Sequence, residues 1–333
     1  MAQSLPSSAR SYARARRAEI RAALVASRRL WRQMGPDFDA SYAGLEVSLL
    51  TAVYTAQGRV AERAGEYVPR VMGQTGFGDV EPDYVVPHEA WVGTAGDGRD
   101  VPGLAYGAVT TAKRAVAAGY PESLALASGG AFLTKAVGTL LSDTARGAEQ
   151  VGAKASRVGT FVRVLSPPSC GRCVILAGQT YGSSTAFDRH PGCDCYNIPA
   201  PENVAGDMVS DPHEYLDHLS DDELARTLGS KANAQAWRDG ADVNQLVNAY
   251  RRGGDVRKAQ VYGRSVKVTT EGTTRRGWAY HSMAQADYLR AAGERRAGRY
   301  MRAKAPRLMP ASIYEVATDP ADVQRLLRLY GWL

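Results

Sequence analysis

The sequence predicts a mainly α-helical protein of the α+β class. We expect an elongated helical N-terminal region, a small cysteine-rich domain with short strands, and a helical C-terminal region. Apolar residues recur at helical spacing through most of residues 9–152, which is typical of packed helices. A β-branched run follows at Thr160–Leu165, which favours a strand. All four cysteines then fall within 26 residues. The expected domains are 1–155, 156–201 and 202–333.

The composition is that of a folded protein. The chain has 333 residues, of which 44% are hydrophobic and 23% are charged. Disordered and collagen-like chains are excluded by these values, and the length suits roughly two or three domains. We find no apolar run of the roughly 18 residues that a membrane helix needs, and no signal-peptide core. We therefore expect a soluble, intracellular product.

The net charge of +7 is concentrated at the N-terminus. Residues 1–33 contain eight arginines and one acid, Glu19, whereas the rest of the chain is neutral. Residues 9–34 form an amphipathic pattern whose apolar face is Ile20, Leu24, Ser27, Trp31 and Met34. Six arginines gather beside that face in an arc of roughly 60°; this arginine ridge is Arg10, Arg14, Arg17, Arg21, Arg28 and Arg32. It is either a solvated flank or a surface that contacts phosphate, which suits the planar donor fork of arginine.

Three further helices complete the N-terminal region. The first covers residues 38–68 and should stop at Pro69. A loop rich in glycine and proline follows to about residue 100. The other two helices lie near 102–118 and 121–152. Apolar stripes predict a helical bundle; they are Leu45, Leu49, Ala52, Val53, Ala56 and Val60, and then Leu133, Val137, Leu140, Thr144, Ala148 and Val151.

The C-terminal region begins with an acidic stretch, 202–223, which has eight acids and no Lys or Arg. Ser220 and Glu223 form a capping box. Helices are expected at 229–239, 242–251 and, rich in basic residues, 282–304, with a short strand or hairpin around residues 266–270. The final helix should begin after Asp319, with Pro320 at its first position.

The cysteines form a pattern typical of a metal site. Cys170-x2-Cys173 is followed, after sixteen intervening residues, by His190-Pro-Gly-Cys193-Asp-Cys195. Two thiolates from a tight turn and a second pair nearby can complete a tetrahedral structural Zn²⁺ site. Sequence does not choose the second pair among His190, Cys193 and Cys195. Disulfides are disfavoured in an intracellular chain, and a redox Cys-x2-Cys motif needs no second pair.

No catalytic set of residues is recognisable. A nucleobase deaminase needs His-x-Glu before Pro-Cys-x2-Cys. Here Ser169 separates Pro168 from Cys170, and the nearest His-Glu pair, His88-Glu89, lacks the spacer residue. A zinc site with four protein ligands has no open position for water, which favours a structural role.

The segment from Ser169 to Pro199 resembles the phage Mu F-type minor head proteins, in the versions found in tailed phages of actinobacteria. The shared motif is Cys-x2-Cys, an apolar stretch with Gly, then His-Pro-x-Cys-x-Cys and a nearby Pro. Specific similarity covers roughly 160–333 and includes Asp211–Tyr215, Ala232–Asp242, Val247–Ala249, Thr273–Gly277, Arg307–Tyr314 and Tyr330–Leu333. Many relatives carry Arg between the last two cysteines, where this chain has Asp194.

The resemblance implies a structural virion protein inside the phage head near the portal, made in the host cytoplasm, which assists head assembly and DNA packaging or ejection. The implied partners are the portal protein, the major capsid or scaffolding protein, and packaged double-stranded DNA, without a membrane. Some relatives are instead described as capsid maturation proteases, so a protease or another zinc-dependent enzyme of head assembly is the alternative. A cellular zinc-dependent nucleic-acid module is a third interpretation.

Overall fold

The computed structural model confirms a mainly α-helical fold with some β-structure. The residues that the structure describes are 5–182, 185, 190, 193, 195–201, 211–250, 256–261, 263–274, 277–286, 294–297, 300–303 and 306–333. They form two compact units: unit 1 contains 1–166 and 177–210, and unit 2 contains 167–176 and 211–333. The segment 156–201, which the sequence predicts as one domain, is therefore divided between the two units.

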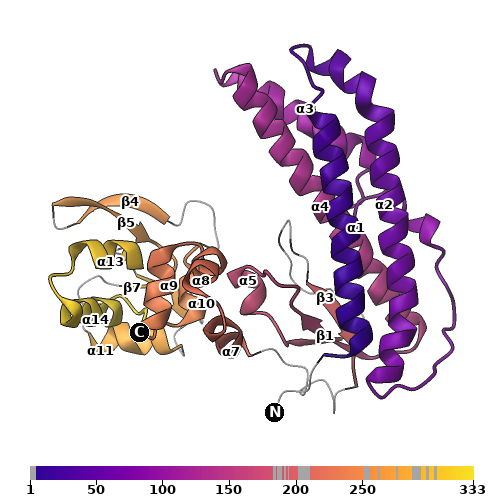
Figure 1. Cartoon of the computed structure of the whole chain (residues 1–333). Helices are drawn as coiled ribbons and strands as arrows, with labels where there is room; N and C mark the ends of the chain where they lie inside the picture. The colour runs from indigo at the N-terminus through magenta and orange to yellow at the C-terminus, as the bar shows by residue number, and fades with distance from the viewer. Residues whose placement is uncertain are drawn as a thin grey trace. The chain divides into compact units, whose positions relative to one another are not determined.

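Unit 1 is built on the helices α1 (Ser7–Trp31), α2 (Phe38–Gln74), α3 (Val101–Ala117) and α4 (Glu122–Ala155). The helices α1, α2 and α4 pack on one another, and α3 packs on α4 (Figure 1). Asp37 caps α2, because its side chain accepts a hydrogen bond from the Ala40 N–H. A short 3₁₀ helix, η1 (His88–Trp91), lies within the predicted loop and packs on α2.

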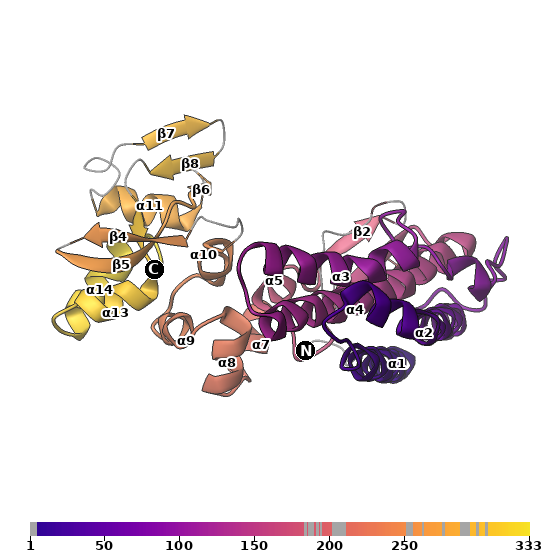
Figure 2. The same ribbon diagram turned by 90° about the horizontal axis from the view of Figure 1, so that it is seen from above.

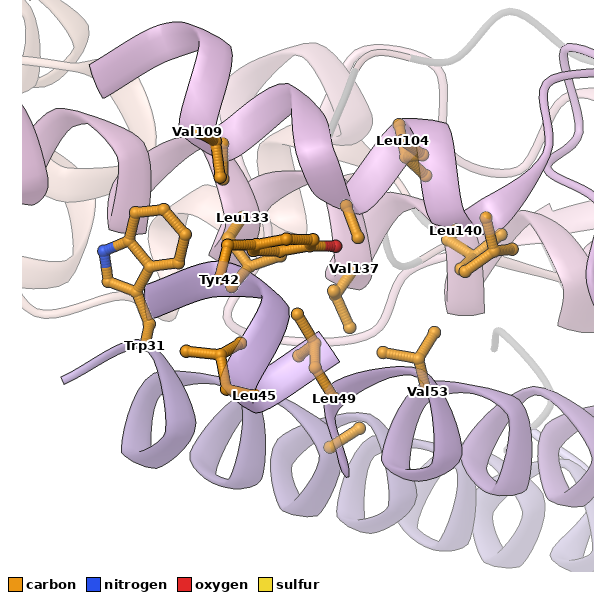
Figure 3. Packing of buried hydrophobic residues seen from close by; sticks show 14 of the residues in the cluster. Trp31, Tyr42, Leu45, Leu49, Val53, Leu104, Val109, Leu133, Val137 and Leu140 are labelled. Atoms are coloured by element: carbon orange, nitrogen blue, oxygen red, sulfur yellow. The ribbon is translucent and has the colours of Figure 1, made fainter. Parts of the chain in front are cut away.

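The predicted apolar stripes meet in the core of this bundle. Figure 3 shows Trp31 from α1, Leu45, Leu49 and Val53 from α2, and side chains of α3 and α4 packed together. Burying a side chain of this size stabilises the fold by about 1.5–3 kcal/mol. By length and apolar content α4 could cross a membrane. Its apolar side chains, which include Leu133, Val137 and Leu140, instead fill the bundle core.

The prediction that Pro69 ends the second helix is wrong, because α2 continues to Gln74. Proline removes one backbone hydrogen bond and crowds the carbonyl four residues before it, here that of Gly65. Pro69 and Gly65 are both exposed, so water can donate a hydrogen bond to the Gly65 carbonyl. The next turn buries Val71 and Met72 in a second apolar cluster, and this burial offsets the lost hydrogen bond.

A small antiparallel sheet packs against the bundle in unit 1. The predicted strand at 160–165 is β1 (Thr160–Val164), and it lies between β2 (Thr180–Gly182) and β3 (Tyr196–Pro199). The side chains of Val162, Val164 and Ile198 join the second apolar cluster with residues of α2, and β3 contacts α2 and α4. This packing fixes the backbone on both sides of the cysteine-rich segment that belongs to unit 1.

In the residues that the structure describes, unit 2 consists of short helices and two small sheets (Figure 2). The helices are α5 (Gly171–Val174), α7 (Pro212–Asp217), α8 (Asp221–Leu228), α9 (Lys231–Arg238), α10 (Val243–Asn248), α11 (Trp278–Gln285), α13 (Pro310–Val316) and α14 (Pro320–Leu329). The capping box of Ser220 and Glu223 and the cap of Asp319 are confirmed. Residues 202–210 of the acidic stretch lie outside the described residues.

The strands of unit 2 form the sheets β4-β5-β9 and β6-β8-β7 within the described residues. Their bounds are β4 (Val256–Val261), β5 (Arg264–Thr269), β6 (Thr273–Thr274), β7 (Glu294–Ala297), β8 (Tyr300–Ala303) and β9 (Arg307–Leu308). The hairpin of β4 and β5 confirms the predicted strand around residues 266–270.

The prediction of one basic helix over 282–304 is wrong. Helix α11 ends at Gln285, and β7 and β8 pair antiparallel instead (Figure 2). A helix over this range would contain Gly293 and Gly298, and each glycine costs about 1 kcal/mol in a helix interior. Strand β8 pairs with both β6 and β7, and the backbone hydrogen bonds of this sheet stabilise the extended conformation.

Candidate metal centre

The first cysteine pair lies at the start of a tight helical turn. Cys170 precedes α5, and its carbonyl accepts hydrogen bonds from the N–H groups of Cys173 and Val174 at 2.9 and 3.0 Å. Gly171 is needed here for close packing, because an added Cβ would lie 2.7 Å from Cγ2 of Val247. Its φ is not in the left-handed region, so close packing against Val247, and not backbone conformation, is what calls for glycine here.

The second group of donors lies just before β3. The Cys193 N–H donates to the His190 carbonyl at 3.0 Å, and Cys195 immediately precedes Tyr196, the first residue of β3. Cys193 and Cys195 are almost completely buried, with exposed fractions of 1% and 0%. The bundle and the sheet of unit 1 therefore hold these two cysteines in a dry environment.

The predicted donors come together as two groups that share one residue. The ligand atoms of Cys170, Cys173 and His190 all lie within 4.8 Å of one another, and so do those of Cys173, Cys193 and Cys195. All four cysteines fall within the described residues, and none forms a disulfide bond. Five soft or imidazole donors in this arrangement could hold a metal ion, and Cys173 is the donor common to both groups.

A buried arginine that the sequence analysis did not single out contacts two of these sulfurs. Nη2 of Arg163, in β1, donates to Sγ of Cys193 at 3.7 Å and to Sγ of Cys195 at 3.8 Å. The Arg163 side chain is only 1% exposed. The sequence carried a signal for it, since a charged residue stands inside the apolar run Phe161–Leu165, where it must be paired or bonded if buried.

Two further buried arginines bind the backbone of the same segment. Nη1 of Arg146 donates to the carbonyls of Cys193 and Cys195 at 2.8 and 3.1 Å. Arg146 is also paired with Asp143. Nη1 of Arg16 reaches the Cys195 carbonyl at 3.4 Å. Buried guanidinium groups therefore hold the backbone carbonyls of both cysteines.

Arg16 also belongs to a buried polar network. Its Nη1 lies 3.5 Å from Oε1 of Glu149, and both side chains are almost fully buried. The Tyr12 hydroxyl donates to Oε1 of Glu149 at 2.6 Å, and the Asn197 N–H donates to Oε2 at 2.9 Å. Burial raises the pKa of Glu149, against the opposing effects of Arg16, the Tyr12 hydroxyl and the Asn197 N–H. Burial also raises the pKa of Tyr12.

The arginine ridge lies mostly in solvent. Five of its members are exposed, and Arg17 is partly buried and donates to Oγ of Ser166 at 2.6 Å. Arg28 donates to Oγ1 of Thr134 at 3.3 Å, and Arg10 donates to the carbonyl of Leu5. The exposed guanidinium groups leave donors available for an anionic partner, whereas Arg17 is tied to its own unit.

Comparisons of the chain with protein-family models, with curated proteins and with solved structures give no match.

Proposed function

We propose that this protein is a structural minor head protein of a tailed bacteriophage, of the phage Mu F type, which acts inside the head near the portal. The observation that carries the proposal is the motif from Cys170 to Cys195, whose donors lie close together in space. A motif match alone concerns spacing along the chain. Spatial proximity of the same donors supports the interpretation of the motif as a metal-binding unit.

We propose that the metal is Zn²⁺ in a structural role. Thiolate and imidazole donors suit Zn²⁺, and its structural sites take four such ligands in a tetrahedron. Cys173 belongs to both donor groups, so we assign it as a ligand. When four protein ligands surround the ion, water has no position from which to act as a nucleophile. The proposal therefore gives the zinc no part in catalysis.

The arginine ridge is the proposed contact surface for packaged DNA or for acidic groups of the portal protein. Its exposed members are Arg10, Arg14, Arg21, Arg28 and Arg32. The only acid of α1, Glu19, is already paired with Arg63 at 2.6 Å. The exposed charge of the helix is therefore positive along its length, which favours an anionic partner.

The decisive experiment locates the protein and its metal together. Purified virions of the encoding phage are analysed for this chain by mass spectrometry, and the protein recovered from them is analysed for zinc. We expect the chain in the virion, with one zinc ion per chain. Absence from virions would overturn the proposed location, and absence of zinc would overturn the proposed metal site.

DNA binding by the ridge is tested through its salt dependence. Replacing Arg14, Arg21, Arg28 and Arg32 with Ala should lower the slope of log affinity against log salt by about 3–4, because each phosphate contact contributes about 0.9. The matched control replaces four exposed arginines outside α1 in the same unit, namely Arg59, Arg70, Arg99 and Arg114. Equal effects of the two variants would mean that the ridge has no special part in DNA binding.

The enzymatic alternative has a direct test of its own. Co-expression with the major capsid protein should leave that protein unprocessed if this chain is structural. Processing that depends on this chain would contradict the proposal and favour a maturation protease.

A further inference from the structure

The position of Arg163 is fixed by its own backbone. Its N–H donates to the Gln179 carbonyl at 3.1 Å, and its carbonyl accepts from the Gly178 N–H at 2.9 Å. On the other side, Arg163 is paired in register with Asn197 of β3. Because β1 is the central strand of this sheet, the base of the Arg163 side chain cannot shift without breaking pairing on both sides.

From this fixed base the guanidinium reaches both cysteine sulfurs. A single nitrogen, Nη2, lies 3.7 Å from Sγ of Cys193 and 3.8 Å from Sγ of Cys195. The two donor–acceptor distances are nearly equal, so one planar group contacts both sulfurs. Arg146 meanwhile holds the carbonyls of the same two residues. Side chains and backbone of this cysteine pair are thus fixed by separate guanidinium groups.

The charges favour the same interpretation. Thiolates are the form of cysteine that binds metals, and several thiolates around one divalent ion leave net negative charge. Burying that charge without an opposite charge nearby is costly. A guanidinium that is 1% exposed and in contact with two sulfurs supplies the opposite charge where it is needed. Hydrogen bonds between ionised partners are also stronger than neutral ones.

We infer that Arg163 is a positioning residue of the metal site, which holds the sulfurs of Cys193 and Cys195 at the spacing at which both bind one divalent ion. This inference rests on the metal site proposed above. It places Cys193 and Cys195 together in the ligand set with Cys173, and it leaves the fourth position to Cys170 or His190.

The test compares the zinc affinity of the full chain and its variants by competition with a chelator. Arg163→Met removes both hydrogen bonds and should weaken Zn²⁺ binding by about 10–100-fold, the usual effect of losing a group that orients metal ligands. Arg163→Lys keeps the charge but not the planar fork, and should recover part of the affinity. The absorption bands of Co²⁺ in place of Zn²⁺ should lose the pattern of a regular tetrahedron in Arg163→Met.

Val162→Ala is the matched control for simple destabilisation. Val162 is the neighbour of Arg163 in β1 and is fully buried, but its side chain leaves the opposite face of the strand. This variant should lower the stability of the sheet and leave zinc affinity unchanged. If Arg163→Met does not fold, the affinity of Arg163→Lys relative to Val162→Ala decides the question.

The outcomes separate the two proposals. Zinc bound by the natural protein and equally well by the Arg163 variants would overturn the role of Arg163 and leave the metal site standing. Equal weakening in Arg163→Met and Val162→Ala would also overturn it, because stability alone would explain the loss. A natural protein that binds no zinc would overturn the metal site and this inference together.

Discussion

Replacing Arg16 with Met should destabilise unit 1 far more than replacing Arg70 with Met. Arg70 is an exposed arginine whose ion pair has the same N–O distance. Arg16 and Glu149 are 3.5 Å apart and almost fully buried. Arg70 and Glu66 are also 3.5 Å apart, but their side chains are 69% and 55% exposed. Coulomb's law at this distance gives about 1.2 kcal/mol in bulk water and about 4.7 kcal/mol at an effective dielectric constant of 20. The two ion pairs therefore have the same distance but different burial, and Arg16 in addition reaches the Cys195 carbonyl at 3.4 Å.

The expected loss for Arg16→Met is about 3–5 kcal/mol, because the Glu149 carboxylate stays buried without its cation. The expected loss for Arg70→Met is about 0–1 kcal/mol. Adding Glu149→Gln to Arg16→Met should restore at least half of the stability, since both buried charges are then gone. The glutamine oxygen can accept from the Asn197 N–H, and the Tyr12 hydroxyl can accept from the glutamine amide.

The loss should also depend on pH. Burial already raises the pKa of Glu149 above its ordinary value of 4.5, and removing Arg16 should raise this pKa further. The folded variant then binds a proton more tightly than the unfolded chain does. Its stability should fall as pH rises from 4.5 through the raised pKa. In more acidic solution the carboxyl group is neutral in both proteins, so the difference between them should shrink.

The assay is hydrogen exchange of the α1 and α4 amides at increasing urea concentration, which follows unit 1 by itself. Two results would refute the reasoning. One is an equal loss in Arg16→Met and Arg70→Met. The other is a double variant, Arg16→Met with Glu149→Gln, that is no more stable than Arg16→Met alone.

Three further predictions concern packing and the metal site. Gly129→Ala places a Cβ 2.6 Å from Cζ2 of Trp31 and 2.7 Å from a backbone oxygen; it should cost about 1–3 kcal/mol. Gly65→Ala, in an open part of α2, should raise the free energy of unfolding by about 0.5–1 kcal/mol. Both glycine variants are measured in the same urea experiment, and stabilisation by Gly129→Ala as well would contradict the packing around Trp31. Cys173→Ser should abolish zinc retention in elemental analysis, because Cys173 belongs to both donor groups; full retention would remove it from the ligand set. Trp332→Ala should cost about 3–5 kcal/mol, measured by hydrogen exchange of α14, because the indole is fully buried and its Nε1 donates to a carbonyl at 2.8 Å; an unchanged exchange rate would count against that packing.

Local signals predicted much of the fold. The caps at Asp37, Ser220 and Asp319 act within one turn of helix, so a short sequence window contains the whole interaction. Apolar periodicity likewise identified the residues that meet in the bundle core. The two wrong predictions, a helix end at Pro69 and a helix over 282–304, both concern segments whose neighbours in space decide the outcome. Burial after Pro69 and strand pairing at β7 and β8 outweigh the local preference.

The candidate site shows the same division. Cysteine and histidine spacing predicted which side chains come close together, because a tight turn brings the residues of a Cys-x2-Cys pair together whatever surrounds them. The arginine ridge followed from the helical angle between residues. The same angle places Arg16 beside Tyr12 and Ala23 on the buried face, but the sequence does not say which acidic residue forms an ion pair with Arg16.

The sequence by itself determined the helix faces, the helix caps, the residue types of the candidate metal donors and their spacing. The tertiary structure alone decided which charges are buried and what they contact. Arg163 meets the sulfurs of Cys193 and Cys195, and Arg16 meets Glu149, although the partners lie far apart along the chain. Such pairs form because packing excludes water from both groups at once, and exclusion of water is a property of the folded assembly of helices and strands rather than of any segment.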